Sequence, residues 1–111
     1  MKGKKASVSH RERVIDELKR DPALAAEYLN VAAEAGDAQS YLLALRTVAE
    51  AQGMTKVAKA AGVPRESMYR ALSPNGNPRL STLTAVLKAA GLRMTVAIHP
   101  RRKSMALSTG K

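Results

Sequence analysis

Apolar residues along most of the chain recur three or four positions apart, which is the spacing of an amphipathic helix. This pattern predicts helices over residues 11–20, 22–35 and 38–52. Asp21 and Asp37 precede the second and third helices as N-caps, while Gly36 and Gly53 are expected to end them. The third helix is the most apolar, so it is expected to form a central strut. The expected buried residues are Val14, Ile15, Leu18, Leu24, Tyr28, Val31, Ala32, Ala35, Tyr41, Leu42, Leu45, Val48 and Ala49.

Residues 54–72, MTKVAKAAGVPRESMYRAL, predict two short helices joined by a tight turn. Thr55 is expected to cap the first helix, Gly62 to adopt a left-handed turn conformation, and Pro64 to open the second helix. Ala58 is small enough to let the two helices cross closely. This arrangement is typical of a helix-turn-helix, whose second helix lies in the major groove of DNA. The apolar stripes are Val57, Ala58 and Ala61 in the first helix, and Met68, Ala71 and Leu72 in the second, with Val63 packing inward between them.

Several polar residues of this stretch and of the turn-rich segment after it are candidates for contacting DNA. Arginine can bind guanine or phosphate, and serine and tyrosine can reach phosphates or base edges. The two asparagines of the turn could equally serve turn formation alone. An ordinary helical hairpin with a solvated charged face is the alternative interpretation. The predicted DNA-binding residues are Thr55, Lys56, Arg65, Glu66, Ser67, Tyr69, Arg70, Asn75, Asn77 and Arg79.

The C-terminal part predicts one more helix and then a change of period. Ser81 is expected to cap a helix that ends at Gly91 and buries Leu83, Val86, Leu87 and Ala90. Residues 92–98 then alternate, with Leu92, Met94, Val96 and Ile98 on one side, which predicts a half-buried strand. A lone strand leaves backbone groups unpaired, so it is expected to pair with its own symmetry mate or with another protein. The alternative is a short extended tail packed on the helices.

These elements predict an all-α fold: a compact helical bundle with a lambda-repressor-like helix-turn-helix and one C-terminal β-strand. A single domain is expected over residues 11–99, between disordered basic tails at residues 1–10 and 100–111. The chain has 111 residues and no cysteine, phenylalanine or tryptophan, so small aliphatic side chains must fill the core. No apolar run is long enough to cross a membrane, and a soluble cytoplasmic protein is the default expectation.

Charge is distributed very unevenly around the net value of +10. Residues 21–53 contain one basic and five acidic residues, whereas residues 54–103 contain ten basic residues and one acidic residue, Glu66. The basic part includes the predicted helix-turn-helix, so its natural partner is a polyanion such as double-stranded DNA.

Residues that could support catalysis are scattered. His10 is expected in a tail and His99 at the end of a strand, and Asp16 and Glu17 point in different directions because they are neighbours on a helix. Gly62, Gly76 and Gly91 are each expected in a turn or cap rather than in a phosphate-binding loop. We therefore expect no enzymatic activity, no metal site and no cofactor.

The chain resembles the addiction-module antidote (antitoxin) family, helix-turn-helix proteins related to the HigA type. The resemblance spans roughly residues 18–98 and rests on the runs DPALAAEYLNVAAEAGD, LLALRTVAEAQGMTKVAKAAGV, RESMYRALSPNGNPRLSTL and KAAGLRMTV. Pro64 is a departure, because such proteins usually have a capping serine there. The resemblance implies a type II toxin–antitoxin module, in which the antitoxin binds a RelE/ParE-like toxin and represses the shared operon.

The leading hypothesis from sequence is therefore a dimeric antitoxin that binds operator DNA. A stand-alone phage-type repressor would share every DNA-binding feature and differ only in lacking a toxin. A pure interaction module, in which the hairpin is only a scaffold, is the third hypothesis. The acidic helices before residue 54 could contact a basic toxin or could simply be solvated.

Overall fold

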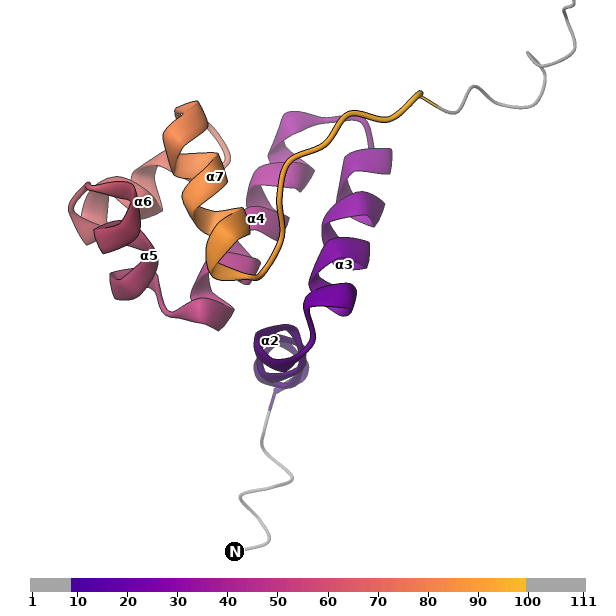
Figure 1. Cartoon of the computed structure of the whole chain (residues 1–111), viewed down its shortest axis with the longest axis horizontal. Helices are drawn as coiled ribbons and strands as arrows, with labels where there is room; N and C mark the ends of the chain where they lie inside the picture. Colours follow the sequence, from indigo (N-terminus) through magenta and orange to yellow (C-terminus); the bar gives the residue numbers. More distant parts are fainter. Residues whose placement is uncertain (1–8, 100–111) are drawn as a thin grey trace, which may run out of the picture.

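The computed structural model describes residues 9–99 and consists there of helices joined by short turns (Figure 1). The tails expected at residues 1–10 and 100–111 lie outside the described residues except for Ser9 and His10. These two residues form the start of the first helix rather than part of a tail. Within residues 9–99 six helices and no strand are formed. The helices are α2 (His10–Arg20), α3 (Pro22–Glu34), α4 (Ala38–Gln52), α5 (Met54–Ala61), α6 (Arg65–Ala71) and α7 (Leu80–Ala89).

Side-chain caps begin the first three helices. Ser9 accepts a hydrogen bond from the backbone N–H of Glu12, whose side chain accepts one from the backbone of Ser9 in return. The carboxylate of Asp21 accepts from the N–H of Ala23 at 3.0 Å, and that of Asp37 from the N–H of Ser40 at 2.9 Å. These capping residues agree with the expectation for α3 and α4.

The caps expected for the later helices are wrong. Gly53 occupies the N-cap position of α5, so Thr55 lies inside the helix and caps nothing. Pro64 is the N-cap of α6 rather than its first residue, and Arg79 rather than Ser81 is the N-cap of α7. None of these three helices has a side-chain cap, so water or neighbouring backbone must satisfy the N–H groups of their first turns.

Helix α4 is the central strut, as expected. It packs against α2, α3, α5 and α7, and Val48 and Ala49 at its middle are completely buried. Leucine, valine, alanine and methionine from all the other described helices join it in one continuous core. Figure 1 shows α4 and α7 between α3 at one end of the molecule and the α5–α6 pair at the other. No helix within residues 9–99 is long and apolar enough to cross a membrane.

Helix α3 buries less of its surface than its pattern predicts. Leu29 and Ala25 are buried, but Val31 is 59% exposed, and Ala35 is exposed at the C-cap. The reason is that the main helix neighbours of α3 are α2 and α4, so residues at the rim of its apolar stripe are left without a helix to cover them.

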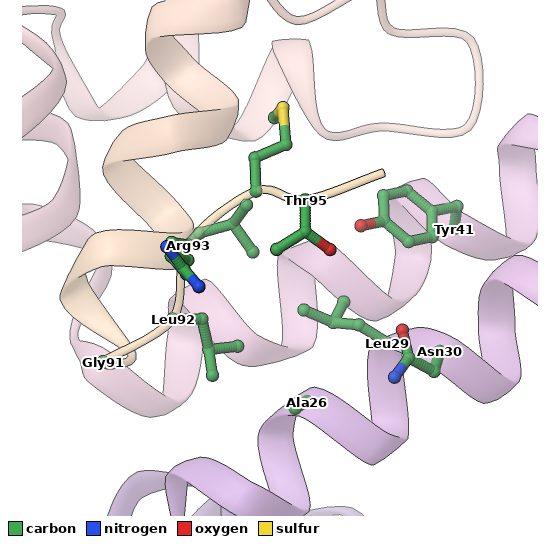
Figure 2. Close-up of a pocket in the computed structure, with 10 residues that line it drawn as sticks. Ala26, Leu29, Asn30, Tyr41, Gly91, Leu92, Arg93 and Thr95 are labelled. Carbon is green, nitrogen blue, oxygen red and sulfur yellow. The ribbon is translucent and has the colours of Figure 1, made fainter. Parts of the chain in front are cut away.

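The predicted strand is not formed among the described residues. Residues 92–99 run as an extended segment, and only Leu92 packs against the core. Figure 2 shows the start of this segment crossing Leu29 and Asn30 of α3 and Tyr41 of α4, over a pocket of about 410 Å³. Farther along, Val96 is 97% exposed and Ile98 is 94% exposed. A single extended segment without a neighbouring strand has no ladder to join, which explains why the alternation does not produce a strand here.

Candidate nucleic-acid interface

The turn between α5 and α6 sets the direction of α6. Gly62 has a φ of 73°, in the left-handed region, and its N–H donates to the carbonyl oxygen of Lys59 at 3.1 Å. The N–H of Val63 donates to the carbonyl oxygen of Ala58 at 3.0 Å, which closes the turn. Met68 and Leu72 are buried in the core with Val57. These contacts leave the opposite face of α6 toward solvent.

That solvent-facing side of α6 carries four of the predicted DNA-binding residues. Arg65, Glu66 and Arg70 are exposed and Tyr69 is half-buried. Positions 65 and 69 are four residues apart, as are positions 66 and 70, and the two pairs are adjacent, so all four share one face of the helix. Ser67 lies at the edge of this face and accepts a hydrogen bond from Nη2 of Arg70 at 3.5 Å. The structure therefore brings these five residues together.

Tyr69 is held between helices by two arginines. The guanidinium carbons of Arg65 and of Arg46, on α4, each lie 5.4 Å from the centre of its ring, which is cation–π distance. Nε of Arg46 lies 3.5 Å from Oε2 of Glu50, and Glu50 also pairs with Arg11 of α2. Ionic and aromatic contacts thus connect α2, α4 and α6.

Arg46 was not predicted as a site residue. In the sequence it is an isolated cation in the acidic stretch of residues 21–53, and nothing local relates it to Tyr69, 23 positions later. The one available signal is that it is the only basic residue of residues 21–53.

The remaining predicted residues lie outside α6. Thr55 and Lys56 are exposed in the first turn of α5, and Asn75, Asn77 and Arg79 lie between α6 and α7. Within the described residues neither asparagine side chain makes a hydrogen bond. The turn is instead closed by the hydroxyl of Ser73, which donates to the carbonyl oxygen of Arg70 at 2.8 Å, and by the N–H of Gly76, which donates to the carbonyl oxygen of Ser73 at 2.8 Å. The asparagine amides are therefore free to bind a ligand.

Gly76 is required by close packing rather than by its backbone angles. A Cβ atom built on Gly76 would lie 2.0 Å from the carbonyl oxygen of Ala71, far inside van der Waals contact. The turn that carries Asn75 and Asn77 can therefore pass so close to the end of α6 only with glycine at this position.

The structure separates the two charge classes in space. We call α3 and α4 with their caps (residues 21–53) the acidic hairpin, and residues 54–99, which contain α5, α6 and α7, the basic unit. The basic unit contains seven basic residues and one acidic residue. Because α6 and α3 lie at opposite ends of the molecule (Figure 1), the candidate DNA-binding face is remote from most of the acidic side chains. Of these two ends, the one that carries α6 is therefore the more attractive to a polyanion.

Comparison with known proteins gives a consistent result. A family model described as "Probable addiction module antidote protein" matches residues 11–98. A protein of Haemophilus influenzae, described only as uncharacterized, is 39% identical over 69 residues, which cover 62% of this chain and 71% of that protein. No solved structure matches. Since the family model covers most of the chain and all six described helices from their first turns onward, the chain belongs to the addiction-module antidote family.

Proposed function

We propose that the protein is the DNA-binding antitoxin of a type II toxin–antitoxin module. In this proposal α5 and α6 form a lambda-repressor-like helix-turn-helix of the HigA type, which binds operator DNA and represses the operon. The same chain neutralises a RelE/ParE-like toxin by binding it. Membership of the antidote family supports a toxin partner over a stand-alone phage-type repressor.

The observation that carries the DNA-binding half is the exposed face of α6. Arg65, Glu66, Tyr69 and Arg70 project from a helix whose other side is buried, in the basic unit of the molecule. An α-helix fits the major groove, and two arginines there can bind guanine edges bidentately or neutralise phosphates. Asn75, Asn77 and Arg79 follow α6 in the chain and Lys56 lies on α5, and in this proposal all four would contact phosphates beside the groove.

We further propose that the protein acts as a homodimer through residues 92–98. In an extended chain alternate side chains share a face, so Met94, Val96 and Ile98 would form an apolar row, and their backbone groups would pair with the same segment of a second copy. A dimer would present two α6 helices to half-sites about 34 Å apart. The exposure of Val96 and Ile98 supports this use, because covering them removes apolar surface from water.

The DNA-binding half is tested by fluorescence anisotropy with a labelled fragment of the protein's own promoter. We expect Arg65→Ala and Arg70→Ala each to weaken binding about tenfold or more, because each removes a contact worth about 1–3 kcal/mol. Arg13→Ala is the control, since Arg13 is an exposed arginine of α2 with no ion pair among the described residues. Unchanged affinity in both α6 variants would remove these residues from the interface.

The dimer is tested separately by light scattering on Val96→Pro, which removes a backbone donor from any strand pair. We expect this variant to be monomeric and to lose affinity for a two-half-site operator. If it remains dimeric and loses toxin binding instead, the segment pairs with the toxin.

A further inference from the structure

An apolar groove of about 420 Å³ runs between α3 and α4 on the acidic hairpin. It is lined by Leu24, Glu27, Tyr28, Val31, Ala32, Ser40, Leu43 and Ala44. Val31 is 59% exposed and Leu43 is 55% exposed. The groove therefore brings together two of the exposed large apolar side chains of the described residues. A contiguous apolar surface of this kind typically marks an interaction site.

Glu27 is the one charged residue among those that line this groove. Elsewhere on the acidic hairpin, Glu34 ends α3 and Asp37 caps α4. Helix α3 contains no basic residue, and Arg46, the only one of α4, is directed to the ring of Tyr69 on α6. The groove therefore combines apolar walls with the negative charge of Glu27, which forms no ion pair among the described residues.

This charge decides between the possible occupants. DNA is excluded, because phosphates would face the carboxylates. A second copy is disfavoured, because a twofold interface brings the same patch of each molecule together, so Glu27 of each copy would meet a surface with no basic lining residue. A partner with basic residues around an apolar ridge fits both properties of the groove.

We propose that this groove is the toxin-binding surface, and that it receives an amphipathic basic helix of the toxin. A channel between two helices accommodates a third helix through apolar anchors spaced three or four residues apart. In this arrangement the toxin and DNA occupy different ends of the molecule, and residues 92–98 remain available for dimerisation. This inference depends on the proposed function in one respect, which is that the partner is the toxin.

The test uses the full-length chain and the protein encoded by the adjacent open reading frame, with binding measured by isothermal titration calorimetry. We expect the double variant Val31→Gln/Leu43→Gln to bind at least about tenfold more weakly, because buried apolar anchors carry most of the affinity of an interface. Glu27→Lys should also weaken binding. Leu80→Gln is the matched control: Leu80 is 64% exposed but lies outside the groove, and its variant should bind like the wild type.

The outcomes separate the two proposals. If the wild-type chain does not bind the neighbouring protein, the toxin-binding half of the proposed function fails, and this inference fails with it. If the wild type binds and the double variant binds equally well, the groove assignment is overturned while the function stands. Light scattering and promoter binding on the same variant provide the last check, since a loss of dimerisation would identify the groove as an interface between copies and overturn the proposal.

Discussion

The acidic hairpin and the basic unit share one hydrophobic core, yet their surfaces have opposite properties. Helix α4 of the acidic hairpin packs on α5 and α7 of the basic unit, and its completely buried Val48 lies in the cluster that joins the two regions. The acidic hairpin exposes apolar residues beside the carboxylate of Glu27, whereas the basic unit exposes arginines, lysines and amides. A small fold can therefore present two chemically distinct surfaces at opposite ends of one core. The five predictions below test whether the two surfaces are independent and whether their common core is a single unit.

Salt should affect the two surfaces very differently. With six or more phosphates neutralised by the seven basic residues of the basic unit, promoter affinity should fall about a thousandfold between 50 and 200 mM salt. Binding of the toxin to the apolar groove should fall by less than about tenfold over the same range, because buried apolar anchors rather than charges carry most of that affinity. Anisotropy and calorimetry in matched buffers measure both. Equal salt dependence of the two affinities would contradict the assignment of DNA to the basic unit and of the toxin to the groove.

Truncation of core residues should show that the two surfaces share one folding unit. Met68→Ala in the basic unit and Leu29→Ala in the acidic hairpin should each lower the free energy of unfolding by about 2–5 kcal/mol, because each leaves a cavity at a buried position. Chemical denaturation followed by circular dichroism should give one transition in both variants. Two transitions would mean that the regions fold separately.

Two glycines of the basic unit should differ in their tolerance of alanine. A Cβ on Gly62 meets no atom within 4 Å. Gly62→Ala should therefore lower the free energy of unfolding only by the penalty of holding an alanine in the left-handed conformation, about 1–2 kcal/mol. Gly76→Ala must also displace the turn from Ala71, so it should cost more stability and reduce promoter affinity as well. Thermal unfolding and anisotropy test both variants, and equal losses of stability would contradict the close approach at Gly76.

Arg46 offers a test of the contact between the two regions. Arg46→Met keeps an unbranched apolar side chain but removes the cation–π contact with Tyr69, so promoter affinity should fall about two- to fivefold. The variants Arg46→Met, Tyr69→Leu and their combination form a double-mutant cycle, in which the losses should be less than additive. Arg20→Met, on α2, is the control. Strict additivity would show that Arg46 does not position Tyr69.

The smallest expected effect concerns the cap of α4. Hydrogen bonds from the backbone N–H and then the hydroxyl of Ser40 lower the pKa of Asp37 below its ordinary value of 3.8. A carboxylate whose pKa is lower in the folded state adds stability above its unfolded pKa and loses that stability as the pH falls through the folded pKa. Asparagine at this position would keep the cap without titrating, so the Tm advantage of the wild type over Asp37→Asn at pH 7 should shrink by pH 3. A constant difference would contradict the pKa shift.

Helix positions were largely predictable because they depend on local patterns. Apolar spacing, together with Asp21 and Asp37 as caps, placed α3 and α4 to within about a residue. Gly62 adopts the left-handed conformation that was expected of it. The starts of α5, α6 and α7 were less accurate, since no side chain caps them and packing decides where each helix begins.

Which helices and segments pack against one another could not be predicted from local patterns. The period-2 pattern of residues 92–98 states which side chains share a face, but a strand also requires a neighbour, and none is present among the described residues. Likewise, the exposure of Val31 and the contact of Arg46 with Tyr69 depend on which helices pack together. Local sequence encodes the conformation of a segment through interactions a few residues apart. Which surfaces stay open, and which distant residues meet, follows from competition among all helices for the same core.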